Sequence, residues 1–154
     1  MAEMELAMVL HLLGAFLLFS GVVLAGVAFE AARRRELPAE IALLLGLARL
    51  SLPFVAIGAL LAAVFGFWLV HLIHFSYSEG WVNVSIVLFL AMLAIGGFAG
   101  RTPRRARLLA TQLAAEGAPM SAELRALLDD LVSRLANYVA FALLIAIVVV
   151  MVVK

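Results

Sequence analysis

The chain has 154 residues, of which 67% are hydrophobic and 14% charged, and its net charge at pH 7 is +1. Soluble domains usually carry about 25% charged residues, so the composition indicates a single integral membrane domain that contacts the lipid bilayer and has no nucleic-acid partner. The chain contains no cysteine, which excludes disulfides, iron–sulfur clusters, thiolate metal sites and covalently attached c-type haem.

The first predicted span covers residues 6–32 and is followed by arginines. Its length and its acidic start differ from a cleaved signal peptide, so we expect a retained membrane helix. Small residues recur at every seventh position of this span: Ala7, Gly14, Gly21 and Ala28. Such a stripe lets a neighbouring helix approach closely. His11 lies beside the stripe, so we expect its side chain to face protein rather than lipid.

The second predicted span covers residues 52–75, which contain no Asp, Glu, Lys or Arg. At about 1.5 Å per helical residue this stretch crosses the roughly 30 Å hydrocarbon core of a bilayer. An amphipathic lead-in, 41–49, precedes it, and Pro53 is expected to kink the junction. Two histidines, His71 and His74, lie near its end. Its small residues form a second face for close packing: Gly58, Ala59, Ala62, Ala63 and Gly66.

Two further spans are predicted over residues 81–98 and 136–153, separated by a polar, helix-forming segment, 103–135. The predicted fold is therefore all-α: a four-transmembrane-helix bundle with a cytoplasmic amphipathic helical hairpin between the third and fourth spans. The whole chain, 1–154, forms one membrane domain.

Within the segment 103–135, Thr102 is expected to cap a basic helix that has Pro103 in its first turn. Ser121 is expected to start a second helix. Because neither glycine nor proline follows Ser121, we expect one long helix that runs without a break into the fourth span and packs back on the basic helix.

Charge asymmetry predicts the orientation of the bundle. The first and third connections hold arginines, whereas the second holds only Glu79: Arg33, Arg34, Arg35 and Arg49 in the first, and Arg101, Arg104, Arg105 and Arg107 in the third. By the positive-inside rule, the first and third connections are cytoplasmic. We therefore expect a multi-pass protein of a bacterial inner (plasma) membrane, with its N-terminus and C-terminus outside.

The three histidines, His11, His71 and His74, are the candidate cofactor-binding and metal-binding residues, because histidine is costly inside a membrane. The predicted orientation places all three in the outer part of the bundle, with His11 and His71 at similar depth. Two imidazoles on adjacent helices suit a b-type haem (haem b) held between them. The same residues could instead bind copper or zinc. Without a cofactor, His11 would form a structural hydrogen bond and His74 would sit among lipid headgroups.

The stretch MVLHLLGAFLLFSGVVLAGV (8–27), a second span that begins near a proline, and an apolar end at 151–154 resemble a family of uncharacterised bacterial four-helix integral membrane proteins. More distantly, the chain resembles the HemJ-type protoporphyrinogen oxidases and the CopD-like copper-resistance membrane domain. In the HemJ type, a first-span histidine and a lysine in a later span hold haem. His11 matches that histidine, but no predicted span contains a lysine, so the resemblance leaves His71 or His74 as the second ligand.

Three functional hypotheses follow from the sequence. The first is a redox protein that binds b-type haem between the first two helices and exchanges electrons with quinone or a membrane redox partner. The second is a protein that binds or transports copper or zinc. The third is a cofactor-free structural or assembly subunit that works through helix packing, with a homodimer as one form. No catalytic residue set is identified.

Overall fold

The computed structural model describes residues 2–73 and 79–153. Within these ranges the secondary structure is α-helical, with no strand. Four helical segments, 2–33, 38–72, 80–115 and 122–153, are long and apolar enough to cross a membrane, with mean hydropathies between 2.3 and 2.7. The predicted all-α fold with four spans is confirmed.

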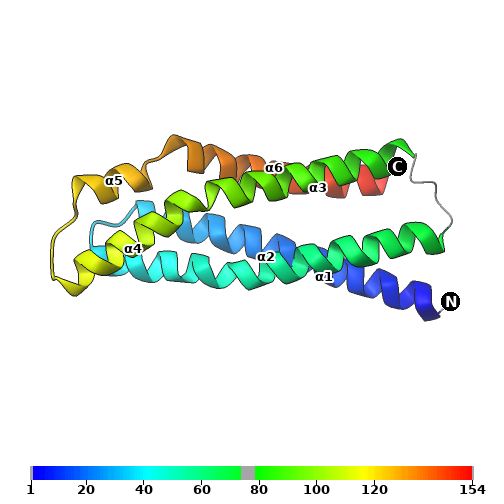
Figure 1. Cartoon of the computed structure of the whole chain (residues 1–154), viewed down its shortest axis with the longest axis horizontal. Helices are drawn as coiled ribbons and strands as arrows, with labels where there is room; N and C mark the ends of the chain where they lie inside the picture. The colour runs from blue at the N-terminus through cyan, green and yellow to red at the C-terminus, as the bar shows by residue number, and fades with distance from the viewer. Residues whose placement is uncertain (1, 74–78, 154) are drawn as a thin grey trace.

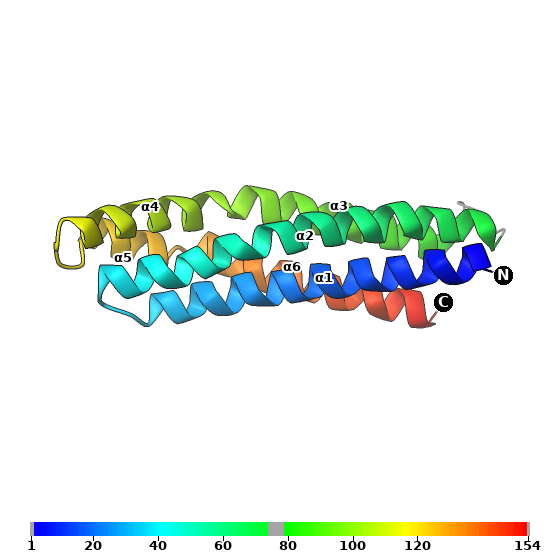
Figure 2. The same cartoon turned by 90° about the horizontal axis from the view of Figure 1, so that it is seen from below.

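The helices form an elongated bundle built from two pairs (Figures 1 and 2). Their bounds are α1 (Ala2–Arg33), α2 (Pro38–Leu72), α3 (Gly80–Ala99), α4 (Arg101–Ala115), α5 (Ala122–Leu128) and α6 (Leu131–Val153). α1 packs against α2, and α3 packs against α6. Both chain ends lie at one end of the bundle (Figure 1). The other end holds α4, α5 and residues 28–47, and we call it the polar end.

Small residues set the distance between α1 and α2. The predicted stripe is buried at all four of its positions: Ala7, Gly14, Gly21 and Ala28. A Cβ atom at Gly14 would lie 2.5 Å from the backbone nitrogen of Ala62, and one at Gly58 would collide with the backbone of Leu18. The two backbones are therefore in direct contact, and the prediction that this stripe packs against a neighbouring helix is confirmed.

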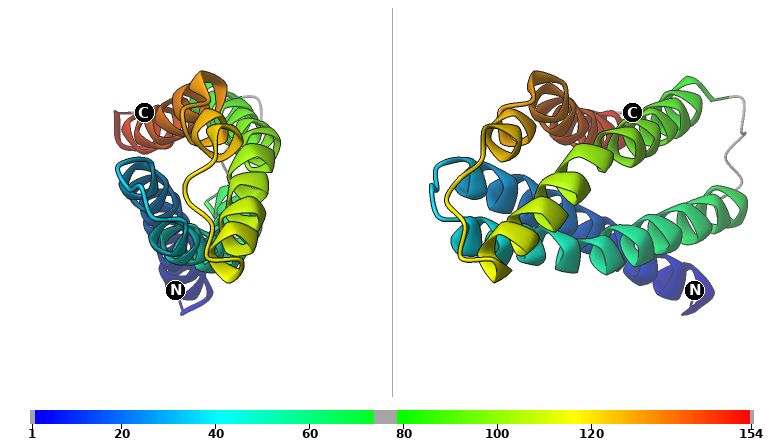
Figure 3. Two further views of the ribbon diagram at one scale, coloured as in Figure 1. Left: turned by 90° about the vertical axis from the view of Figure 1, so that its left-hand side faces the viewer. Right: turned by 60° about the vertical axis from the view of Figure 1, so that its left-hand side comes forward.

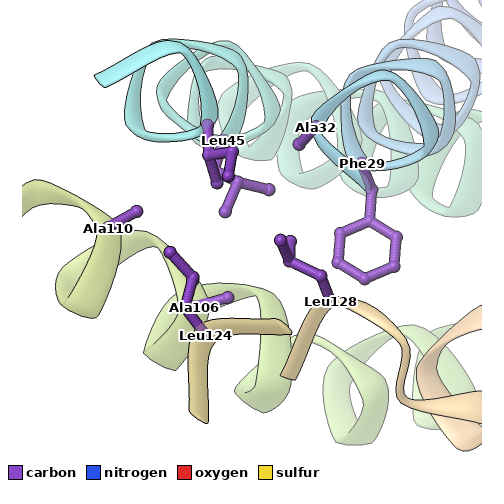
Figure 4. Packing of buried hydrophobic residues seen from close by; sticks show 8 residues of the cluster. Phe29, Ala32, Leu45, Ala106, Ala110, Leu124 and Leu128 are labelled. Atoms are coloured by element: carbon purple, nitrogen blue, oxygen red, sulfur yellow. The ribbon is translucent and has the colours of Figure 1, made fainter. Parts of the chain in front are cut away.

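A core of fully or nearly buried side chains holds the polar end together (Figure 4). It brings α1, α2, α4 and α5 into contact through eight residues: Phe29, Ala32, Ile41, Leu45, Ala106, Ala110, Leu124 and Leu128. We call this the polar-end core. The alanines of α4 face α2, so the predicted hairpin between the third and fourth spans packs on the first helix pair and on itself.

A second cluster of buried side chains joins the two helix pairs inside the apolar part of the bundle: Leu18, Ala59, Met92, Ala140 and Leu144. Nearby, the rings of Phe19 and Phe141 lie with centroids 5.8 Å apart. Gly26 of α1 leaves room for the amide of Asn137 on α6, which a Cβ at Gly26 would approach to 2.6 Å. α1 therefore contacts both its partner α2 and the opposite pair.

The prediction of one long helix from Ser121 into the fourth span is wrong. The helical conformation is interrupted at Asp129 and Asp130. Figure 3 shows α5 as a short helix set off from α6. Asp130 accepts hydrogen bonds from the backbone nitrogen and the hydroxyl of Ser133, at 2.9 and 2.6 Å, and so caps α6. The expected start at Ser121 is confirmed, since its hydroxyl accepts a 3.1 Å bond from the nitrogen of Leu124.

The expected cap at Thr102 is also wrong. α4 begins at Arg101 and follows Gly100 without a side-chain cap. Gly100 has helical dihedral angles, φ −66° and ψ −9°, and its nitrogen donates to the carbonyl of Gly96 at 3.1 Å. α4 thus follows α3 with only a turn between them, and its start has no side-chain cap.

Candidate functional site

His11 forms an interhelical hydrogen bond inside the α1–α2 interface. Its Nδ1 lies 2.8 Å from the carbonyl oxygen of Ala62, and the side chain is half-buried. A carbonyl oxygen can only accept, so Nδ1 is the nitrogen that holds the proton in this contact. In the neutral imidazole, the other ring nitrogen, Nε2, then carries the lone pair. The prediction that His11 faces protein is confirmed.

Gly66 provides the space that the ring of His11 occupies. A Cβ atom at this position would lie 3.0 Å from Cε1 and 3.1 Å from Nδ1 of His11. The acceptor, Ala62, lies one helical turn earlier on the same face of α2. α2 therefore contributes both the acceptor and a glycine-sized gap for this histidine.

The structure does not bring His71 to His11. His11 contacts α2 at the level of Ala62 and Gly66, whereas His71 lies five residues beyond Gly66 and is exposed. Five helical residues correspond to roughly 7 Å along the axis, so the similar depth expected for the two histidines is not observed. His74 falls outside the described residues. The assignment of His11, His71 and His74 as ligands stays a prediction.

The close contact of α1 and α2 restricts where a cofactor would fit. Gly14 lies one turn from His11, and its backbone is in contact with that of Ala62. A porphyrin held by His11 would therefore have to lie beside this helix pair, on the Nε2 side, rather than between the two backbones. Among residues 2–73 and 79–153, no group of three His, Cys, Asp or Glu side chains is arranged to hold a metal ion.

A second polar site lies at the polar end and centres on Arg33. This side chain is only 14% exposed. It donates to Glu30 at 2.8 Å, to Asp129 at 3.1 Å and to the carbonyl of Leu128 at 2.8 Å. Glu30 also lies 3.6 Å from Arg34, so this carboxylate pairs with two neighbouring arginines. Arg33 thus joins the end of α1 to the break between α5 and α6.

Arg125 of α5 completes this contact from the other side. Its guanidinium donates to the carbonyl oxygens of Arg33 and Arg35, at 2.9 and 3.2 Å, which lie at the carboxyl end of α1. A cation is favourable there because the terminal carbonyls have no helical partner. We call Glu30, Arg33, Arg125 and Asp129 the arginine cluster. Sequence reasoning missed it, although two adjacent aspartates before an apolar run are a recognisable signal of a helix start.

The charge of Asp130 is stabilised at the same break. Hydrogen bonds from the hydroxyl and the backbone nitrogen of Ser133 hold the pKa of Asp130 below its ordinary value. The carboxylate is therefore ionised at neutral pH and acts as the cap of α6. The arginine cluster and this cap together fix where the polar segment ends and the last span begins.

Comparison with known proteins identifies a family for this chain. Residues 5–154 match the family model described as "Predicted integral membrane protein (DUF2269)". Comparison with curated proteins and with solved structures gave no match. These findings support the resemblance to an uncharacterised membrane family, and they give no support to the HemJ-type or CopD-like resemblance. Since the match covers nearly the whole chain, the protein belongs to this family of integral membrane proteins.

Proposed function

We propose that this protein is a structural or assembly subunit of the membrane that works through helix packing, with His11 holding α1 against α2. The observation that supports this proposal is the 2.8 Å contact between Nδ1 of His11 and the carbonyl of Ala62, next to the gap at Gly66. Interhelical hydrogen bonds in membranes contribute about 0.6–2 kcal/mol. His11 is therefore already used in packing, one helical turn from Gly14, where the two backbones are in direct contact.

A second candidate is binding of b-type haem for electron transfer, and one observation favours it. With Nδ1 donating to a carbonyl, Nε2 of His11 is available as a ligand. Ligating histidines usually donate their other nitrogen to a carbonyl or carboxylate in this way. His71 or His74 would have to supply the second ligand, and a quinone or a membrane redox partner would exchange the electrons. Copper or zinc would use the same nitrogen.

The orientation that we propose is N-terminus and C-terminus outside, in a bacterial inner membrane. The arginines of the first and third connections all belong to the polar end or its border with the spans, and Arg34, Arg35, Arg101, Arg104 and Arg105 are exposed. The positive-inside rule places such an end in the cytoplasm.

The absorption spectrum of the purified protein distinguishes the two candidates. The protein is expressed with a haem precursor supplied, purified in detergent, and measured oxidised and after reduction with dithionite, with metal content determined on the same sample. We expect no Soret band and no stoichiometric copper or zinc. A Soret band with sharp reduced bands that disappears in His11→Ala would replace the packing proposal with the haem candidate.

Stability measurements on histidine variants test the packing role directly. We expect His11→Ala to lower the free energy of unfolding by about 0.5–2 kcal/mol, and His11→Gln to lower it less, because an amide N–H can still donate to Ala62. His71→Ala is the matched control, since His71 is exposed and we expect a change within about 0.5 kcal/mol. Equal effects of the three substitutions would contradict the packing role.

A further inference from the structure

A groove lies between α3 and α6, where these two helices reach the polar end. Its volume is about 510 Å³ and its lining is apolar. Both helices contribute to the lining, among others with Ala94, Phe98, Val132, Leu135, Ala136 and Val139. We call this the α3–α6 groove. Its volume falls within the roughly 300–1,000 Å³ that is usual for a small-molecule site.

The groove crosses the border between the polar end and the hydrocarbon. The third predicted span ends at Phe98 and the fourth begins at Ala136, and both residues line the groove. Along α6 the groove extends over seven residues, from Val132 to Val139, which is roughly 10 Å. Its inner part therefore lies among acyl chains and its outer part at the headgroups. An occupant must accordingly be amphiphilic, with its polar group on the side of the polar end.

Arg101 lies at the end of the groove that faces the polar end. Its guanidinium carbon is 5.4 Å from the centre of the Phe98 ring, which lines the groove. This cation–π contact places a positive charge beside the apolar lining. Arg105 follows Arg101 by four residues, on the same face of α4, and both side chains are exposed. Two cations are thus available next to one end of the groove.

These cations have no carboxylate partner within residues 2–73 and 79–153. The salt bridges in these ranges involve the arginines at the end of α1, Arg33, Arg34 and Arg35. The arginines of α4 form none, and residues 101–115 contain no Asp or Glu. The carboxylate of Asp130, at the start of α6, accepts instead from the hydroxyl of Ser133. The positive charge at the groove is therefore not neutralised within the described part of the chain.

We propose that the α3–α6 groove binds one anionic phospholipid. An acyl chain lies along the apolar lining, and the phosphate accepts hydrogen bonds from Arg101 and Arg105. A guanidinium can donate two parallel hydrogen bonds to a phosphate, which suits arginine to this role. Basic pockets between membrane helices on the cytoplasmic side are typical sites for anionic headgroups. This inference goes beyond the proposed function and does not depend on it.

A second hollow, along α1, lacks the free charge that this ligand requires. Its volume is about 520 Å³, and its lining includes Glu30, Arg34 and Arg35. Arg34 lies 3.6 Å from Glu30, and Arg35 lies 3.7 Å from Glu40, so carboxylates already neutralise both arginines. Arg34 and Arg35 therefore provide a matched control for Arg101 and Arg105.

Native mass spectrometry of the detergent-purified full chain tests the site. The protein is mixed with equal amounts of phosphatidylglycerol and phosphatidylcholine that carry identical acyl chains. We expect one phosphatidylglycerol per chain, retained severalfold more than phosphatidylcholine. Glycerol 3-phosphate, which has the phosphate without acyl chains, should not bind at the same concentration. Equal retention of the two lipids, or retention of glycerol 3-phosphate as strong as that of phosphatidylglycerol, would overturn the proposal.

Charge variants assign the headgroup contact. We expect the double substitution Arg101→Gln with Arg105→Gln to bring the ratio of the two retained lipids close to one. The control, Arg34→Gln with Arg35→Gln, removes the same charge and should keep the preference. Both pairs are exposed, so neither double variant removes a buried contact. A preference that survives in the first variant, or that falls equally in both, would contradict the assignment of the phosphate to Arg101 and Arg105.

A variant that fills the groove tests the acyl chain separately. We expect Ala136→Phe to lower the retention of both lipids severalfold, because a ring at this position occupies the space of the chain. Val148→Phe is the control, since Val148 is exposed on α6 but does not line the groove. Unchanged retention in folded Ala136→Phe would overturn the groove as the binding place. If Ala136→Phe does not fold, the charge variants still decide the proposal.

Discussion

Glycine residues at the α1–α2 interface determine how closely the two helices approach. Gly58 lies where a Cβ atom would collide with the backbone of Leu18, whereas a Cβ at Gly97 of α3 meets nothing within 4 Å. The same substitution should therefore have opposite effects at the two positions.

We expect Gly58→Ala to lower the free energy of unfolding by about 1–3 kcal/mol, because the added methyl forces the backbones apart. Gly97→Ala is the control, and we expect it to be neutral or to stabilise by up to about 1 kcal/mol, since alanine favours helix. Unfolding of detergent-solubilised protein, followed by circular dichroism, measures both. A Gly58→Ala variant as stable as Gly97→Ala would show that the contact is not close.

The sequence predicted the packing face of α1 but not the depth of its histidine. Ala7, Gly14, Gly21 and Ala28 define a face by their spacing alone, and that face is buried. The depth of His11 relative to His71 depends instead on the register between α1 and α2. That register follows from contacts such as Gly14 with Ala62, which no spacing within one helix specifies.

At the scale of helices, the break between α5 and α6 shows how polar side chains override an apolar pattern. The leucines from Leu124 to Leu135 follow helical spacing, which predicted an uninterrupted helix. Asp130 instead forms hydrogen bonds to the start of α6, and Arg33 takes the last carbonyl of α5. Local side-chain bonds of this kind compete with helical continuation.

The cap at Asp130 makes part of the stability depend on pH. The hydrogen bonds from Ser133 lower the pKa of Asp130 in the folded protein. The contribution of this carboxylate to the free energy of unfolding is therefore complete above the ordinary pKa of aspartate, and it is lost as the pH falls through the lowered pKa. We expect Asp130→Ala to cost about 1 kcal/mol at neutral pH. Thermal unfolding of the unmodified protein and of the Asp130→Ala variant, between about pH 7 and pH 3, measures how this loss of stability depends on pH. If the stability difference between the two proteins does not become smaller at low pH, the role of the Asp130 carboxylate as the cap of α6 is contradicted.

The arginine cluster predicts unequal effects of two neighbouring substitutions. Arg33 is 14% exposed, whereas the side chain of Arg34 is 77% exposed. We expect Arg33→Gln to lower the free energy of unfolding by about 1–3 kcal/mol, because the carbonyl of Leu128 and the carboxylate of Asp129 lose their donor. Arg34→Gln should change it by less than about 0.5 kcal/mol, as solvent screens exposed pairs. Hydrogen exchange in α5 should rise only in the first variant.

For the whole molecule, the fold was predictable because the length and composition of a membrane span are fixed by the bilayer. The four spans and the helical hairpin before the last one are visible in the hydrophobic pattern. The arginine cluster was not predictable, because it joins residues about 95 positions apart, Arg33 and Leu128, through a break that the pattern hides.

The placement of both chain ends at one end of the bundle predicts that they lie on the same side of the membrane (Figure 1). We expect that side to be the outside. Cysteines added at the two ends of the chain and in the α4–α5 turn, labelled by a membrane-impermeant maleimide in intact cells, test this. We expect labelling at both ends and none at the turn until the cells are permeabilised. The reverse pattern would invert the proposed orientation.

The pairing of helices also sets an order of assembly during synthesis. α1 and α2 are consecutive, so we expect their interface to form as soon as both have been synthesised, whereas α3 packs against α6, the last helix to be made. Until α6 is inserted, we expect the face of α3 that packs on α6 to contact lipid, while α4 can already pack on α2 through the polar-end core. We therefore expect insertion of the final span to complete the bundle, by packing onto α3 and onto the α1–α2 pair that has already formed.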